Sequence, residues 1–220
     1  MLIIDTERGY AFDDGPAMQY GEQYWLKHKP MGKSLIGRKL NKFRADLVAR
    51  HGVTRVVDFG IGDGAFLRKC KGTGFGYDVN PLAESWLRDE GRWLDPYEGK
   101  VLELVNGITF WDSIEHVRDP SKILRRIPRE TLAFFSLPII DDLDKLRDWY
   151  HYRPCGCGIK KDHELSGGCG VEHHHYFTHT GFQMFLHRNG LKPIEVHDAE
   201  TRIGRKDVLT YVAEKITDLR

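Results

Sequence analysis

The stretch Val56-Val-Asp-Phe-Gly-Ile-Gly-Asp-Gly-Ala65 decides the fold of this chain. A β-branched run, Arg55–Phe59, leads directly into three alternating glycines, and a helix is predicted over Gly64–Lys71. Glycines suit this turn because it can require positive φ and because a ligand must approach the backbone without meeting a Cβ atom. The start of the helix then offers unpaired N–H groups to a polar or anionic ligand. The stretch therefore predicts a ligand-binding strand–turn–helix unit.

Two aspartates sharpen this prediction. Gly60-Ile-Gly-Asp-Gly-Ala65 satisfies the pattern G-x-G-x-x-G/A, which by itself is weak evidence for a dinucleotide site. Asp58 lies two residues before Gly60, at the end of the predicted strand. Asp78 ends the next predicted strand, 18 residues after Gly60, which is close to the ~20 residues expected for an acid that bonds ribose hydroxyls. The spacing therefore favours a ligand that carries a ribose.

Strands and helices alternate along most of the chain. Further strands are predicted over 74–78, 92–94, 104–111, 131–137, 192–197 and 208–214, and helices over 35–51, 81–90, 120–127 and 180–189. This alternation implies a parallel sheet with helices on both faces. The short connection between the last two strands predicts an antiparallel hairpin. We expect an N-terminal arm and helix (1–52) packed on one domain (53–220), with a lid-like insertion at 141–175.

Several motifs resemble those of class I S-adenosylmethionine-dependent methyltransferases, over roughly residues 56–215. The first glycine segment resembles the family's D-x-G-x-G-x-G motif, and the segment after the next strand is similar to its second motif. A later segment resembles the F-x-D-x-x-E-H-x-x-D-P stretch of the ubiquinone-biosynthesis-like branch (methyltransferase types 11, 12 and 23), and the tail resembles the end of that branch. These segments are Asp58–Gly64, Gly76–Pro81, Phe110–Pro120 and His175–Leu191. The Cys-rich part of 141–175 has no counterpart in the family.

The resemblance implies a Rossmann-like, doubly wound α/β fold with a seven-stranded sheet, an antiparallel last strand and a Cys/His-rich insertion after the fifth strand. S-adenosylmethionine would lie across the carboxyl ends of the first strands. Asp78 would bond the ribose and Val79 would contact the adenine. Asp95 would either accept the adenine amino group or serve as a turn acid beside Pro96. The resemblance assigns to the cofactor Asp58, Gly60, Gly62, Gly64, Asp78, Val79, Asp95, Trp111 and Asp112.

Histidines supply the candidate catalytic groups. Methyl transfer from a sulfonium needs mainly alignment of the acceptor, together with a base where a proton must leave. His116, His174 and His175 are the candidates for that base. In a second interpretation, Glu115 and His116 converge with one or two histidines of the His173–His175 run and hold a divalent metal that binds the acceptor's oxygens. In a third, Glu115 and His116 bond nearby backbone and fix a helix start.

Three of the four cysteines fall in the predicted insertion. Cys155, Cys157 and Cys169, with His163 or His173, could form a structural zinc site of the Cys₃His type. The C-x-C spacing is shorter than that of a usual zinc knuckle, so the alternative is a flexible lid with reduced thiols. The cofactors predicted are therefore S-adenosylmethionine and, as a further candidate, zinc or another divalent metal.

Composition and net charge limit the kinds of binding partner that the sequence indicates. The 220 residues are 40% hydrophobic and 30% charged, with a net charge of +1, so charge does not indicate a nucleic-acid partner. The basic stretch Lys27–Lys42 is either a solvated helix face or a nucleic-acid patch. The aromatic residues Tyr20, Tyr24 and Trp25 either cap the site or dock on the domain. Because no signal peptide or membrane-spanning run is seen, we expect a cytoplasmic protein with no membrane partner.

Four functions remain to be compared. The sequence favours methyl transfer to a small-molecule or modestly polar acceptor. The alternatives are a nucleic-acid or protein methyltransferase, a nicotinamide-dependent oxidoreductase and a non-catalytic partner subunit that binds the cofactor. The absence of a second mononucleotide-binding half argues against the oxidoreductase. The acceptor and the oligomeric state are not determined by the sequence.

Overall fold

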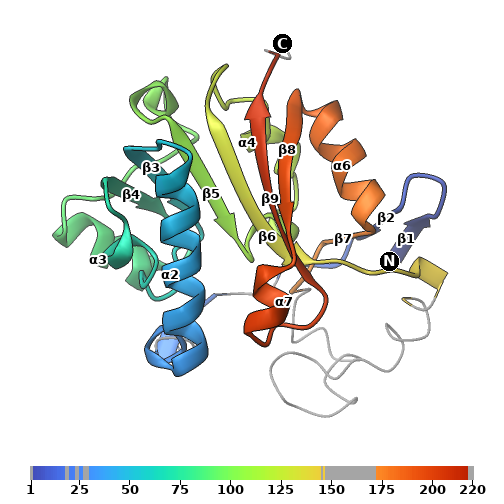
Figure 1. Cartoon of the computed structure of the whole chain (residues 1–220), viewed down its shortest axis with the longest axis horizontal. Coiled ribbons are helices and arrows are strands. Elements are labelled where there is room, and N and C mark those ends of the chain that lie inside the picture. Colours follow the sequence, from blue (N-terminus) through green and yellow to red (C-terminus); the bar gives the residue numbers. More distant parts are fainter. Residues whose placement is uncertain are drawn as a thin grey trace.

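A six-stranded mixed sheet forms the centre of the protein (Figure 1). The computed structural model describes residues 2–17, 20–22, 25–26, 30–144, 146 and 172–217. The strands of this sheet are β3 (Arg55–Phe59), β4 (Thr73–Tyr77), β5 (Gly107–Trp111), β6 (Leu132–Pro138), β8 (Leu191–His197) and β9 (Val208–Lys215). Their order is β4-β3-β5-β6-β9-β8, and β9 runs antiparallel to both of its neighbours. The predicted antiparallel last strand is therefore confirmed.

Helices cover both faces of this sheet (Figure 1). They are α2 (Leu35–Arg50), α3 (Pro81–Asp89), α4 (Pro120–Leu124), α6 (His179–Arg188) and α7 (Ala199–Ile203). Polar side chains cap the starts of four of them: Ser34 accepts from the Gly37 N–H, Asn80 from the Leu82 N–H, Asp119 from the Lys122 N–H and Thr178 from the Gly181 N–H. Among the described residues, no helix is both long and apolar enough to cross a membrane.

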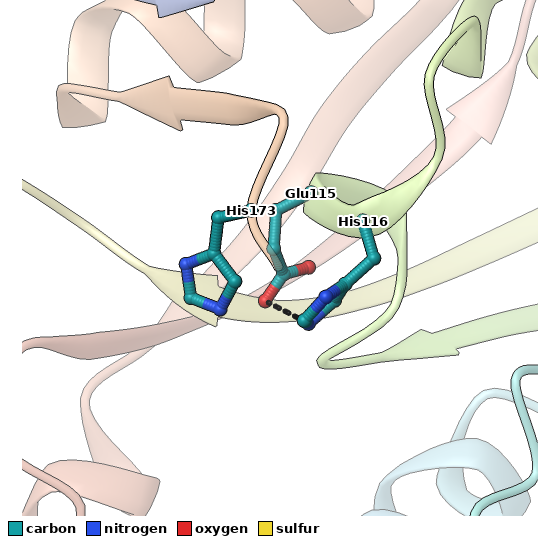
Figure 2. A group of neighbouring side chains, drawn as sticks. All are labelled: Glu115, His116 and His173. Carbon is teal, nitrogen blue, oxygen red and sulfur yellow. Dashed lines mark ion pairs between the residues drawn. The ribbon is translucent and has the colours of Figure 1, made fainter. Parts of the chain in front are cut away.

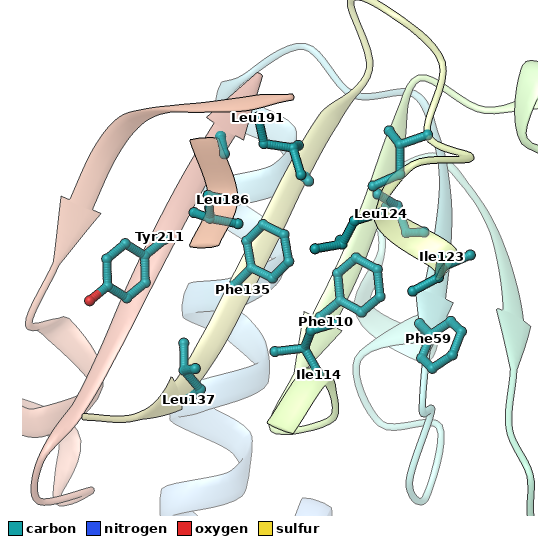
Figure 3. Packing of buried hydrophobic residues seen from close by; sticks show 14 of the residues in the cluster. Phe59, Phe110, Ile114, Ile123, Leu124, Phe135, Leu137, Leu186, Leu191 and Tyr211 are labelled. Atoms are coloured by element: carbon teal, nitrogen blue, oxygen red, sulfur yellow. The ribbon is translucent and has the colours of Figure 1, made fainter. Parts of the chain in front are cut away.

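Side chains alternate between two hydrophobic layers along the central strands. Phe110 and Phe135 belong to one layer, with α4 and α6, whereas their neighbours Trp111 and Phe134 belong to the other, with α2 and α3. The rings of Phe110 and Phe135 stack at 5.1 Å between neighbouring strands (Figure 3). This alternation is the two-residue period of a β-strand, with both faces buried, as expected for a parallel sheet covered by helices.

Two predicted elements do not form a regular strand or α-helix, and two others are shorter than predicted: the strand of 104–111 begins at Gly107 and the helix of 120–127 ends at Leu124. The third of the seven predicted strands, 92–94, forms only one isolated bridge, between Trp93 and Gly76. The turn at Asp95–Pro96 ends it at once, because proline has no N–H to donate. The helix predicted over Gly64–Lys71 is reduced to a 3₁₀ helix at Leu67–Lys69, because the chain must turn back to begin β4. The Cys/His-rich insertion lies mostly outside the described residues.

The N-terminal arm contributes a second, three-stranded sheet that sequence patterns do not predict. Its order is β1 (Leu2–Asp5), β2 (Tyr10–Asp13) and β7 (His175–Phe177), all antiparallel. Figure 1 shows this sheet beside α6, next to the end of β6. The arm therefore pairs with the segment that carries the triple-histidine run.

A buried ion-pair network ties α2 and α7 to the end of β5. Arg44 on α2 donates from Nε and Nη2 to Glu200 at 2.7 and 2.8 Å, and from Nη2 to Asp112 at 2.8 Å. Arg205 donates to the same two carboxylates, at 2.6 Å to Asp112 and 2.9 Å to Glu200. Burial opposes ionisation of Asp112, but the two guanidinium groups outweigh it and lower the pKa of this carboxyl to about 2. The network therefore fixes the chain directly after β5.

We predict that Arg44→Met lowers the free energy of unfolding by about 3–5 kcal/mol, because it leaves buried carboxylates with one cation instead of two. Lys42→Met on the same helix is the matched control, since Lys42 forms an exposed pair with Asp46 and should contribute less than about 1 kcal/mol. Urea unfolding followed by circular dichroism measures both. Equal losses in the two variants would contradict a stabilising role for the network.

Candidate functional site

The glycine turn after β3 forms the base of the site. Gly60 and Gly62 have φ of 82° and 53°, in the left-handed region that favours glycine. A Cβ on Gly60 would lie 2.7 Å from the Cβ of Ser113, whereas a Cβ on Gly62 would meet nothing within 4 Å. Gly60 is therefore required for contact with the loop after β5, and the backbone of Gly62 is open to a ligand.

Two buried aspartates lie against this turn. Burial raises the pKa of Asp78 to about 6, although backbone N–H groups of Asn80, Gly62 and Ile61 favour its ionised form. Burial likewise raises the pKa of Asp58 to about 7, and Thr109 donates to Asp58 at 2.7 Å. The carboxyl group of Asp78 therefore contacts the glycine turn itself, so that a ligand on the turn would meet it.

One cavity of about 650 Å³ lies along the carboxyl ends of β3, β4 and β5. This volume is within the roughly 300–1,000 Å³ range of small-molecule sites. Aromatic side chains, Tyr77 and Tyr97 among them, form its apolar part. Six of the nine residues that the sequence assigns to the cofactor line it, namely Gly60, Gly62, Asp78, Val79, Trp111 and Asp112. We call it the cofactor cavity.

A second cavity of about 690 Å³ adjoins the first. The two share five lining residues: Gly60, Gly62, Trp111, Asp112 and His116. The second cavity extends instead towards α2 and α7, where Arg44, Arg205 and Asp58 line it. We call it the acceptor cavity, because a molecule bound there would lie directly beside one bound on the glycine turn.

A cluster of three side chains lines the acceptor cavity. Glu115 and His116 belong to the 3₁₀ helix η4 (Ile114–His116), and His173 precedes β7. Figure 2 shows the three side chains pointing towards a common space, and one ligand atom from each lies within 4.8 Å of the others. One of the interpretations left open by the sequence has Glu115 and His116 converge with one or two histidines of the run, without saying which. In the structure, the histidine that joins Glu115 and His116 is His173.

The other two histidines of the run occupy different surroundings. His174 lies 2.9 Å from the Asp13 carbonyl through Nδ1, and His175 lies 2.8 Å from the Val117 carbonyl through Nε2 and 2.8 Å from the Tyr10 hydroxyl through Nδ1. Burial lowers the pKa of His175 to about 4, so this ring is neutral at pH 7. Neither side chain is among those that line the two cavities. Of the predicted bases, His116 is the one that the structure places in them.

The remaining predicted residues differ in where they lie, and several fall outside the described residues. Asp95 accepts from the Tyr97 N–H at 2.8 Å in the turn beside Pro96, and Tyr97 rather than Asp95 lines the cofactor cavity. Gly64 lies under the ring of Trp86. Tyr20 lines the cofactor cavity, with its hydroxyl 3.0 Å from Nδ1 of His116. Four predicted zinc ligands, together with Tyr24, lie outside the described residues: Cys155, Cys157, His163 and Cys169.

The sequence did not predict the two arginines that line the acceptor cavity, Arg44 and Arg205. Arg44 lies four residues from both Leu40 and Val48, which are buried on the inner face of α2, so its position on an apolar helix face was a detectable signal. No comparable signal marks Arg205 or Glu200, because the residues that join them to the rest of the network, Asp112 and Arg44, lie 93 and 156 positions away in the sequence. The apolar part of the cofactor cavity, formed by Tyr77 and Tyr97, was also missed.

Comparison with known proteins agrees with this geometry. A family model described as a methyltransferase domain matches residues 29–196. A search among curated proteins finds no match. The fold is similar to an S-adenosylmethionine-dependent methyltransferase from Clostridium acetobutylicum, at 13% identity and a TM-score of 0.56 over 88% of this chain and 100% of that one.

Two further solved structures share the fold. Human N-acetylserotonin methyltransferase, in complex with S-adenosylmethionine, is 16% identical, with a TM-score of 0.55 over 88% of this chain and 57% of that one. The magnesium protoporphyrin IX methyltransferase of Synechocystis, with bound S-adenosylhomocysteine, is 13% identical, with a TM-score of 0.53 over 82% and 84%. At these identities the likeness concerns the fold alone. Because the family model covers more than half of the chain, the protein belongs to the methyltransferase-domain family and is a class I S-adenosylmethionine-dependent methyltransferase.

We predict that the affinity for S-adenosylmethionine falls as the pH is lowered through 6. The pKa of Asp78 is raised to about 6, so the carboxylate is ionised at neutral pH and can accept hydrogen bonds from ribose hydroxyls. Below that pH, protonation competes with binding and should weaken affinity by up to about tenfold per pH unit. Calorimetric titrations at several pH values measure this. The pH dependence should shrink in Asp78→Asn, and an unchanged profile in that variant would contradict the assignment.

Proposed function

We propose that the protein binds S-adenosylmethionine in the cofactor cavity and transfers its methyl group to a small polar molecule in the acceptor cavity. The observation that carries this proposal is the wall that the two cavities share, formed by the glycine turn, Trp111, Asp112 and His116. A methyl donor and an acceptor bound in two adjoining cavities that share these residues can approach in line. Such alignment can contribute several kcal/mol to the reaction.

The polar lining supports the orientation of the cofactor. Asp78 would bond the ribose, and Val79, Tyr77 and Tyr97 would contact the adenine at the apolar end of the cavity. The cationic ammonium and sulfonium groups of the cofactor would then extend along Gly60 and Gly62 towards the buried carboxyl group of Asp58, which lines the adjoining acceptor cavity. Charge complementarity between this acid and the cationic ligand favours the same direction.

The properties of the acceptor cavity support a small, polar acceptor. A cavity of about 690 Å³ holds a small molecule, and its charged lining suits polar groups. Two proteins of the same fold are named for small-molecule acceptors, magnesium protoporphyrin IX and N-acetylserotonin. Transfer to a nucleic acid or a protein is the alternative. The net charge of +1 does not favour a nucleic acid.

The first test is calorimetric titration of the protein with S-adenosylmethionine and, separately, with NAD. We expect saturable binding of S-adenosylmethionine alone. Asp78→Asn should weaken that binding by about 10- to 100-fold, because a hydrogen bond to a charged group contributes about 1.5–3 kcal/mol. Asp89→Asn, at an exposed aspartate on α3, is the matched control and should bind normally.

A thermal unfolding scan of Asp78→Asn separates loss of the ligand from loss of the fold. No binding of S-adenosylmethionine by the unmodified protein would refute the proposal. If binding is observed, methyl transfer is then screened with radiolabelled cofactor and pools of small hydroxyl-, amine- and carboxyl-containing molecules.

A further inference from the structure

The Glu115 side chain has an unusual environment. It is 2% exposed, and neither of its carboxylate oxygens has a hydrogen-bond partner among the described residues. Buried polar groups are nearly always hydrogen-bonded, because desolvation without compensation is costly. Nε2 of His116 lies 3.9 Å from Oε1 of Glu115, within ion-pair range but too far for a hydrogen bond (Figure 2). The carboxylate therefore points to a ligand other than a protein donor.

We propose that Glu115, His116 and His173 bind one divalent first-row metal ion, whose remaining coordination positions face the acceptor cavity. Ligand atoms bonded to one ion at about 2.0–2.2 Å must lie a few ångströms apart. The atoms of this cluster, all within 4.8 Å of one another, need to move only slightly to meet that requirement. Two imidazoles and one carboxylate form a ligand set that suits such metals and leaves positions open for a substrate.

Hydrogen bonds outside the cluster hold the ligands in place. Nδ1 of His116 lies 2.6 Å from the Glu172 carbonyl and therefore donates to it, which leaves Nε2 as the lone-pair nitrogen of the neutral ring. The His174 N–H donates to the Glu115 carbonyl at 2.9 Å. These two bonds join η4 to the segment before β7. A backbone carbonyl that orients a ligating histidine is the arrangement commonly found around metal ions.

The surrounding charges are compatible with a bound cation. Asp112 lies closest in sequence on the cavity wall, and Arg44 and Arg205 already neutralise its carboxylate. Glu115 is the acid within the cluster itself that would balance the ion. Because these arginines contact Asp112 and Glu200, they compensate the neighbouring acids without occupying the Glu115 carboxylate.

The role of the ion, which rests on the proposed function, is to bind the acceptor. A metal lowers the pKa of a hydroxyl that binds to it, so the hydroxyl proton passes to solvent at neutral pH. The oxygen then forms a bond to the methyl carbon, and the carbon–sulfur bond breaks with its electron pair remaining on sulfur, which yields S-adenosylhomocysteine. The open positions favour an acceptor with an ionisable hydroxyl beside a second oxygen, so that both can bind the ion.

The test is a titration of chelator-treated protein with Co²⁺, without cofactor or acceptor, followed by visible absorption. We expect one equivalent to bind and to give the d–d bands of a nitrogen- and oxygen-ligated ion. Glu115→Gln and His173→Gln should each weaken binding by at least about tenfold. His187→Gln, at an exposed histidine on α6, is the matched control and should bind as the unmodified protein does.

Two outcomes would overturn the proposal. One is no Co²⁺ binding by the folded, unmodified protein. The other is equal affinity in the unmodified protein and both cluster variants, with an intense thiolate charge-transfer band that would assign the metal to cysteines instead. Titrating the unmodified protein with S-adenosylmethionine in parallel keeps the two proposals apart. If the protein binds S-adenosylmethionine but not Co²⁺, the metal-site proposal alone is refuted. If it binds Co²⁺ but not S-adenosylmethionine, the proposed function alone is refuted.

Discussion

The ion-pair network around Arg44 is the constraint on which the arrangement of the site depends. Its guanidinium group reaches Glu200 on α7 and Asp112 after β5, and it also lies over the ring of Trp111, 5.0 Å from the ring centroid. Asp112 has a φ of 54°, a strained value for a residue with a side chain, and two arginines hold it there. Trp111 and Asp112 line both cavities, so this network holds in place two of the residues that the cavities share.

The position of the cofactor cavity follows from the topology of the sheet. In the sheet, β4 lies on one side of β3 and β5 lies on the other. The connections that leave β3 and β5 therefore run in opposite directions, and a crevice opens between them at the carboxyl edge of the sheet. Gly60 allows these loops to approach, because any side chain there would collide with Ser113. The turn thus presents backbone N–H groups and a buried carboxyl group to the same space, which suits a ligand with both hydroxyl and cationic groups.

The N-terminal arm takes part in the site through the second sheet. β2 pairs with β7, and Asp13 at the end of β2 donates from its N–H to the His174 carbonyl at 2.8 Å. The same segment is tied to η4 through Glu115 and His116. The arm, the loop after β5 and the segment before β7 therefore meet at one place, and the acceptor cavity is assembled from regions far apart in the chain.

The sequence by itself determined the elements whose signals are local: the glycine turn, the aspartates at the ends of β3 and β4, the alternation of strands and helices, and the antiparallel last strand. One of the interpretations that it left open had Glu115 and His116 meet one or two histidines of the later run. Only the tertiary structure decided that this histidine is His173, because consecutive side chains of an extended segment point to opposite sides and the register is set by pairing with the arm. Likewise, the reduced third strand and the partners of Arg44, 68 and 156 positions away, depend on contacts that no local pattern encodes.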